Sequence, residues 1–117
     1  MSLYVDVSRR RNVLIVRLSG ELDHHTASDV RKQMEEELSK GIDTNLVLNL
    51  SELSFMDSSG LGVILGRYRQ VSQLGGRMGV CSVQPSIRRL FELSGMFKIL
   101  SFYEDEDAAI RACGVAS

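Results

Sequence analysis

Apolar and polar positions follow two different periods along this chain, and the period changes every few residues. Residues 3–7 alternate apolar and polar, which is typical of a half-exposed strand at the edge of a sheet. Residues 13–16 are continuously apolar, as in a strand covered on both faces. Only a short polar run separates the two segments, so the sequence predicts an antiparallel hairpin.

The rest of the chain alternates helical and extended patterns. Thr26 followed by Asp29 resembles a capping box, which predicts a helix that starts there and ends at Gly41. Further helices are predicted over residues 60–74, from Pro85 to Gly95, and from the acidic run 104–107, whose carboxylates suit a helix start. Strands are predicted over residues 46–50, 78–83 and 99–102. The positions expected to face the core are Ala27, Val30, Met34 and Leu38 in the first helix, Leu61, Ile64, Tyr68, Val71 and Leu74 in the second, and Ile87, Leu90 and Phe91 in the third.

This alternation predicts the fold class. Strand–helix repeats from the second strand onward imply an α/β protein with a mixed, mostly parallel five-stranded sheet, an N-terminal β-hairpin and about four helices. A length of 117 residues corresponds to one domain, which we expect to span residues 1–117.

Composition removes several functional classes. The formal net charge of −1 gives no basic field for nucleic acid, and the run Arg9–Arg11 is interpreted as a solvated turn, with a phosphate or lipid contact as the alternative. No membrane span or signal peptide is evident, which favours a cytoplasmic protein. Cys81 and Cys113 lack ligand spacing, so we expect a reducing compartment and a core position for Cys81.

Three loops should meet where the strands end. In open α/β sheets, sites form beyond the carboxyl ends of the strands, and residues 20–25, 54–59 and 84–86 leave that edge here. In the middle loop, Ser58 and Ser59 precede a helix, after a pair, Phe55 and Met56, that we expect to be exposed. We expect one serine to cap the helix while its neighbour is free to react.

The helix start also suits a phosphate. Free N–H groups and the helix dipole favour an anion there, whereas Asp57 opposes it by like-charge repulsion. These effects partly cancel within the domain. Phosphorylation should therefore leave the fold intact and act mainly at the surface of a partner.

Other chemistries have weaker support. Adjacent His24 and His25 rarely bind one ion, and no further ligand follows at a recognisable spacing, so no metal site is expected. A serine hydrolase is not expected without a GxSxG elbow. Gly62 and Gly66 are interpreted as small residues that let the second helix approach a neighbour. Gly60, Gly62 and Gly66 do not match the dinucleotide fingerprint, so no cofactor is expected, although weak nucleotide binding stays open.

The segment 46–68, centred on Asp57-Ser58-Ser59-Gly60, resembles a STAS domain of the bacterial anti-anti-sigma type. Segments 20–26 and 89–99 extend the resemblance over nearly the whole chain. It implies an anti-sigma factor antagonist of sporulation, not an enzyme. Members of this family bind an anti-sigma factor that is also a Ser kinase, and binding frees the sigma factor.

The same resemblance implies a switch. The kinase phosphorylates Ser58 with ATP, the phosphorylated protein no longer competes, and a PP2C-type phosphatase restores it. Two alternatives stay open: an antagonist in a stress-response sigma pathway, and a STAS module that binds a nucleotide or small anion. No direct contact with nucleic acid or membrane is expected. The expected partner-binding residues are Asp23, His24, Asp57, Ser58, Ser59, Gly60 and Leu61.

Overall fold

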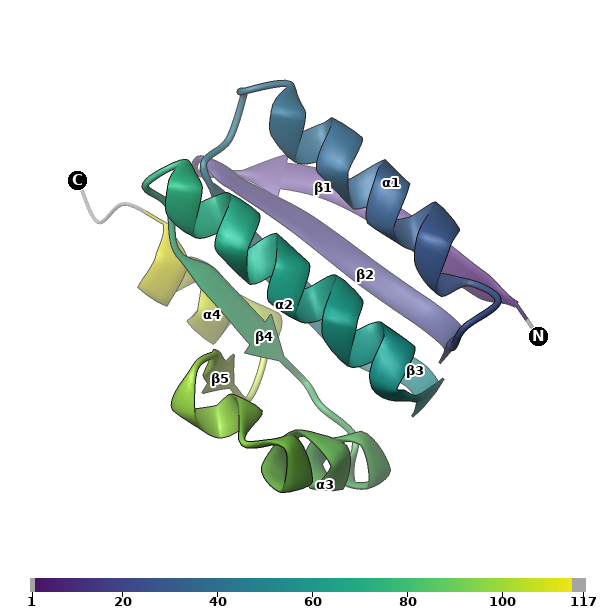
Figure 1. The fold of residues 1–117 in the computed structure, drawn as a ribbon. Helices are drawn as coiled ribbons and strands as arrows, with labels where there is room; N and C mark the ends of the chain where they lie inside the picture. The colour runs from purple at the N-terminus through teal and green to yellow at the C-terminus, as the bar shows by residue number, and fades with distance from the viewer. Residues whose placement is uncertain (1, 115–117) are drawn as a thin grey trace.

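Five strands form one mixed sheet in the computed structural model, which describes residues 2–114 (Figure 1). The strand order follows the chain, β1-β2-β3-β4-β5, with β1 antiparallel to β2 and the other neighbours parallel. The predicted fold class is confirmed. The elements are β1 (Leu3–Arg10), β2 (Val13–Leu22), α1 (Ala27–Ser39), β3 (Asn45–Met56), α2 (Ser58–Gln73), β4 (Met78–Cys81), α3 (Pro85–Ser94), the 3₁₀ helix η1 (Met96–Lys98), β5 (Ser101–Tyr103) and α4 (Glu106–Cys113).

The predicted hairpin is confirmed, and its turn contains two residues. Arg11 and Asn12 connect β1 to β2 with φ angles of 55° and 63°, the left-handed pair that matches the twist of a two-residue hairpin. The interpretation of the arginine run as a solvated turn is wrong for its first two members, which end β1. Arg9 donates to Asp43 and to Glu37, each at 2.7 Å, and so links the hairpin to α1 and the loop behind it.

Strand β3 is much longer than the sequence pattern predicts. The prediction ended at residue 50, whereas β3 continues to Met56 beside β2. Strand β4 pairs only with residues 46–49, because it is shorter than predicted and ends at Cys81. Residues 50–56 of β3 therefore extend about 20 Å beyond the end of β4, at a rise of about 3.3 Å per residue.

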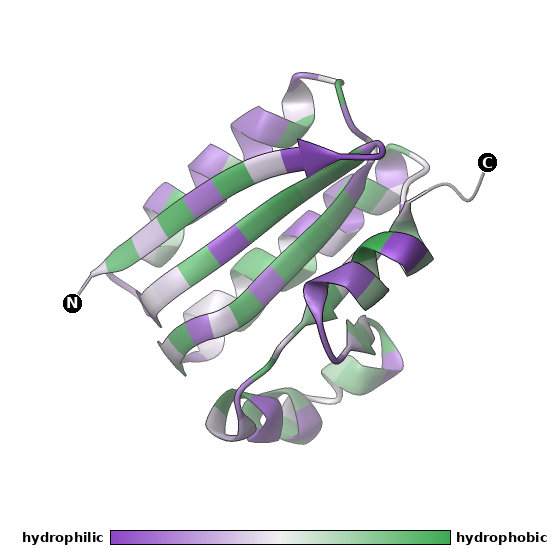
Figure 2. Ribbon diagram, turned by 180° about the vertical axis from the view of Figure 1, so that it is seen from behind, coloured by the Kyte–Doolittle hydropathy of each residue, from purple (hydrophilic) through white to green (hydrophobic). Residues whose placement is uncertain are grey.

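The helices form two unequal layers. Helices α1, α2 and α3 pack on one face of the sheet around the main core, while α4 covers part of the other face with a smaller core that contains Cys81 and Cys113. Both cysteines are buried, and burial raises the pKa of the Cys81 thiol to about 11. Figure 2 shows that α4 leaves much of β1, β2 and β3 uncovered on its face.

The predicted core of α2 needs two corrections. Leu74 is 41% exposed, because the helix ends at Gln73 and the chain turns away there. Val63, which the predicted stripe omitted, is buried. Helix α3 ends as expected at Gly95, whose φ of 76° is a left-handed conformation that suits glycine.

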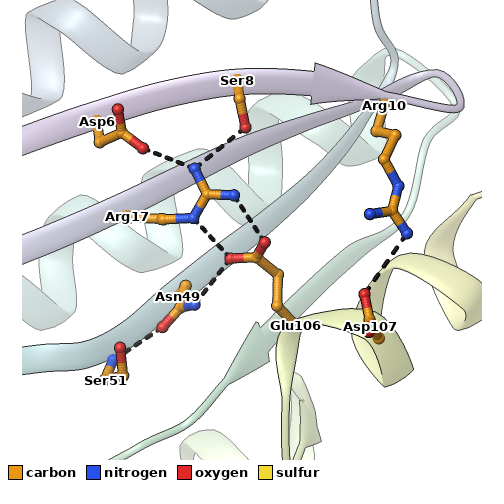
Figure 3. A network of polar contacts seen from close by, with 8 residues as sticks. All are labelled: Asp6, Ser8, Arg10, Arg17, Asn49, Ser51, Glu106 and Asp107. Carbon is orange, nitrogen blue, oxygen red and sulfur yellow. Dashed lines mark hydrogen bonds and ion pairs between the residues drawn. The ribbon is translucent and has the colours of Figure 1, made fainter.

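A polar network lies on the uncovered face of the sheet (Figure 3). The Arg17 guanidinium of β2 donates to both carboxylate oxygens of Glu106 at 2.7 and 2.8 Å, and to Asp6 of β1 at 2.6 Å. Asn49 of β3 also donates to Glu106 at 2.8 Å. The first residue of α4 is thereby attached to the sheet, and the ion pair with Arg17 lowers the pKa of Glu106.

Candidate functional site

Two of the three predicted loops meet at the end of the sheet. Strands β2 and β3 run in parallel to their last residues, where Leu22 pairs with Met56, and the Asp57 N–H donates to the Leu22 carbonyl at 3.2 Å. The Gly20–His25 segment therefore lies beside the start of α2. We call the surface formed by residues 23–25 and 57–61 the rim.

Asp57 caps helix α2, so the prediction that a serine does so is wrong. Its backbone is extended, and its carboxylate accepts from the Ser59 N–H at 2.8 Å. Ser58 and Ser59 are the first two helical residues. The Ser58 side chain is exposed and its hydroxyl makes no hydrogen bond to any other residue between 2 and 114. Ser58 is thus available to another molecule without any loss of capping.

The first backbone N–H groups of α2 are mostly occupied. Besides the Ser59 N–H, those of Gly60 and Leu61 donate to the Asp57 carbonyl at 3.0 and 3.3 Å. A group attached to the Ser58 oxygen would therefore find few free donors in the helix end. It would project outward beside the Asp57 carboxylate rather than become buried in the domain.

Asp23 is the buried member of the rim and has a structural role there. It is 1% exposed, and its carboxylate accepts from the N–H groups of His25 and Thr26 at 2.8 and 3.1 Å. In return the Asp23 N–H donates to the Thr26 hydroxyl at 3.0 Å. These are the two bonds of a capping box. The predicted box of Thr26 with Asp29 is therefore wrong: the box begins three residues earlier, and Thr26 is its second member.

The Asp23 carboxylate is held ionised by these contacts. Burial raises its pKa, but the N–H donors of His25 and Thr26, with the Thr26 hydroxyl, outweigh burial, so the pKa lies below its ordinary value. The predicted contact of Asp23 with a partner stays a prediction; in the structure its side chain is 1% exposed and fixes the loop that carries His24. His24 is exposed, and its Nδ1 lies 3.9 Å from an Asp57 carboxylate oxygen.

Helix α2 carries two glycines without close neighbours beyond Ser58. An added Cβ would have no neighbour within 4 Å at Gly62 or Gly66, so the interpretation that these glycines allow close helix approach is wrong. Gly60 is the closely packed one: a Cβ there would lie 2.4 Å from Met56 Cγ. Leu61 is half-buried at the edge of this surface.

The third predicted loop does not reach the rim. Because β4 ends well before β3, the loop after it lies level with Ser51, whose carbonyl accepts from the Gln84 side chain at 2.8 Å. The pair 55–56 also differs from its prediction: Phe55 is 45% exposed, but Met56 is buried beneath Gly60. Sequence reasoning missed the length of β3, since polar residues 51, 52 and 54 interrupt its apolar pattern.

Residues 4–109 match the STAS domain family, which covers most of the chain and both loops of the rim. The chain therefore belongs to the STAS domain family, and the resemblance drawn from its sequence is confirmed.

Among its relatives is an anti-sigma F factor antagonist from Paenibacillus polymyxa, 51% identical over 117 residues that cover both chains completely. The anti-sigma F factor antagonist of Lysinibacillus sphaericus is 36% identical over 107 residues, or 92% of each chain. The solved structure of the anti-sigma factor antagonist SpoIIAA in its unphosphorylated form has a TM-score of 0.72 at 29% identity and covers 92% of each chain. These relatives are regulatory antagonists.

Among residues 2–114, no helix combines the length and the apolar character that crossing a membrane requires.

Proposed function

We propose that this protein is an anti-sigma factor antagonist whose unphosphorylated rim binds an anti-sigma factor and releases the sporulation sigma factor. Full-length similarity to anti-sigma F factor antagonists supports this role. We further propose that the anti-sigma factor is a Ser kinase of the stage II sporulation protein AB type that phosphorylates Ser58. The observation that carries this proposal is the exposed Ser58 hydroxyl beside a cap made by Asp57.

The charge at the rim suggests how phosphorylation would act. A phosphate adds about −1.5 to −2 charges at neutral pH. Its position next to the Asp57 carboxylate concentrates negative charge on a surface that otherwise presents a neutral hydroxyl and the uncrowded Gly62. Since Ser58 has no capping role, the added group disturbs the contact with the partner and leaves the helix intact.

The return step needs a phosphatase with access to the phosphorylated serine. An exposed phosphoserine at the first position of α2 is accessible from solvent, which suits an enzyme of the PP2C type, as in stage II sporulation protein E. No residue of the rim needs to act as a catalyst in this scheme, and we propose that the protein is not itself an enzyme.

The test combines phosphate mapping with binding. The protein is mixed with a sporulation anti-sigma kinase and ATP, and mass spectrometry should place one phosphate on Ser58. Ser58→Ala should bind the anti-sigma factor constitutively, and Ser58→Asp should bind at least about ten-fold more weakly, because it fixes a charge in the contact. Ser59→Ala is the matched control and should still be phosphorylated at Ser58.

Three outcomes would contradict the proposal. Equal binding by Ser58→Ala and Ser58→Asp would exclude charge as the switch. Phosphate on Ser59 alone would show that the proposal names the wrong serine. Absence of both a complex and a phosphate, together with phosphorylation by a stress-response anti-sigma kinase, would move the protein to that other pathway.

A further inference from the structure

One face of the sheet is left open by the helices at the end that carries the rim. Helix α4 packs on this face over Val13, Ile15 and Val47, in the first halves of β2 and β3. Toward the rim, the same face of β1, β2 and β3 stays uncovered within residues 2–114 (Figure 2). An open sheet face is either solvated by polar side chains or covered by another molecule, and its side chains distinguish the two cases.

Strand alternation determines which side chains of β1 and its neighbours occupy the open face. Leu3 and Val5 pack against the main core, so Tyr4 between them points to the opposite side of the sheet. The register places Tyr4 beside Ser19 of β2, and Ser19 beside Glu52 of β3. These three side chains therefore form one row across the open face.

A second row lies one step closer to the rim. Glu21 of β2 pairs with Phe55 of β3. The neighbours of Phe55 on the other side of the sheet, Leu53 and Met56, belong to the main core, which leaves Phe55 on the open face. We call the surface formed by the two rows the sheet-face patch, which consists of Tyr4, Ser19, Glu21, Glu52 and Phe55.

The sheet-face patch combines aromatic rings with carboxylates. Tyr4 is 70% exposed and Phe55 is 45% exposed, although large apolar side chains are mostly buried in this domain. Glu52 is exposed as well, and Glu21 is half-buried. Exposed rings beside carboxylates are suited to arginine and lysine side chains, because a cation can lie over a ring and pair with an acid at the same time.

The carboxylates of the patch keep their charge free for another molecule. The cation nearest along the strands, Arg17, is shared between Asp6 and Glu106. Within residues 2–114, neither Glu21 nor Glu52 forms a salt bridge. The patch itself contains no cation, so its net charge is negative.

We propose, on the basis of the proposed switch at Ser58, that the sheet-face patch docks a basic segment of the phosphatase that removes the phosphate from Ser58. Arginine or lysine side chains of this segment pair with Glu21 and Glu52 and lie against the rings of Tyr4 and Phe55. The patch is continuous with the rim, because only Met56 and Asp57 separate it from Ser58.

The sign of the charge selects between the partners of the proposed switch. Phosphorylation of Ser58 adds negative charge at the same end of the sheet as the patch. A basic surface is therefore held more tightly by the phosphorylated form than by the unphosphorylated form. The anti-sigma factor has to release the phosphorylated form, whereas the phosphatase has to bind it. Docking of a basic segment on the patch thus favours the return step.

The test compares how fast patch variants lose their phosphate. Each full-length variant is phosphorylated on Ser58 with the anti-sigma kinase and ATP, and kcat and KM are measured with a PP2C-type sporulation phosphatase. Glu52→Lys should raise KM at least about ten-fold with kcat nearly unchanged, because it opposes the cations of the partner away from the reacting phosphate. Phe55→Ala should raise KM too, through loss of the ring.

Glu36→Lys is the matched control for charge. Glu36 is exposed on α1, on the other side of the sheet, so the variant changes the net charge equally and should leave KM unchanged. Raising the ionic strength should reduce the difference between Glu52→Lys and the unmodified chain. The kinase should phosphorylate Glu52→Lys, Phe55→Ala and the control at the same rate. Circular dichroism checks that each variant is folded.

Each contrary result has a separate meaning. An unchanged KM in both Glu52→Lys and Phe55→Ala would overturn the proposal. So would an equal rise in KM for Glu52→Lys and Glu36→Lys, because net charge and not the patch would then be responsible. Slower phosphorylation of Glu52→Lys would assign the patch to the anti-sigma factor. Failure of the phosphatase to act on the unmodified phosphorylated chain would instead overturn the proposed switch, and the docking with it.

Discussion

Asp57 and Asp23 show how single side chains fix the backbone of the rim. Asp57 caps helix α2 in place of a neighbouring serine, and Asp23 forms a capping box together with Thr26. The two aspartates could have been predicted as caps from the sequence, because aspartate is as strong a cap as serine. The prediction chose Ser58 or Ser59, and Thr26, because hydroxyl residues stood nearest the apolar periodic positions. Which of several adjacent cap residues is used depends on where the preceding strand ends, and that end was not predictable from the pattern.

Replacing the Asp57 carboxylate should destabilise the domain. Asp57→Ala removes the acceptor for the Ser59 N–H and should lower the free energy of unfolding by about 1 kcal/mol, whereas Asp57→Asn retains the cap. Urea denaturation of both variants, with Ser58→Ala beside them, measures this. If Ser58→Ala were the destabilised variant and Asp57→Ala were neutral, the serine would be the cap.

Asp23 should contribute to stability in a pH-dependent way. Its pKa is lowered in the folded protein, so its contribution is present above the unfolded pKa, about 4, and is lost as the pH falls through the lower folded value. Asp23→Asn should therefore flatten part of the acid decline in the free energy of unfolding. Chemical denaturation at a series of pH values checks this, and an unchanged acid decline in Asp23→Asn would contradict it.

Among the elements, helix α2 illustrates what periodicity can and cannot predict. The existence of the helix and its approximate bounds followed from apolar spacing and from Gly75-Gly76 beyond its end. The roles of its glycines did not, because spacing alone does not show which side of a helix faces a neighbour. Strand β4 was predicted in place but two residues too long, because residues 82 and 83 lie beyond its end. Strand β5 was predicted from residue 99, but it begins at Ser101 and ends at Tyr103.

The glycines of α2 should respond oppositely to alanine. Gly66→Ala adds a Cβ in open space and should raise the free energy of unfolding by about 0.5–1 kcal/mol through helix propensity and a less flexible unfolded chain. Gly60→Ala should lower it, because its Cβ would meet the Met56 side chain at 2.4 Å and Leu22 at 3.0 Å. Thermal and urea melts of the two variants provide the comparison. Stabilisation by both would mean that Met56 can move away without cost.

For the molecule as a whole, the Arg17 network compensates for an incompletely covered sheet. Helix α4 covers only part of its face, and beyond the first residue of the helix polar pairing takes the place of apolar contact (Figures 2 and 3). Sequence reasoning recognised Glu106 only as a favourable residue at a helix start. Its contact with Arg17 spans 89 positions, and no local pattern indicates a pair at that separation. The fold class was predictable because it depends on short-range order, and this network was not.

The network predicts a second pH dependence. The pKa of Glu106 is lowered by Arg17, so the stabilisation is complete above the unfolded pKa, about 4.3, and declines as the pH falls through the folded value. Since Arg17 is partly exposed, the contribution should be about 1 kcal/mol. Glu106→Gln should be less stable than the unmodified sequence at pH 7, and the difference should be smaller at pH 3, as measured by urea denaturation. A constant difference at both pH values would contradict the ion pair.

The division of roles between Asp57 and Ser58 has a consequence for the lifetime of the protein in a cell. A modification that weakened the cap would make one form unfold more often, and proteases would remove that form faster. With the cap on Asp57, the phosphorylated and unphosphorylated forms should persist equally long. The ratio of the two forms would then record only the balance of kinase and phosphatase, undistorted by degradation.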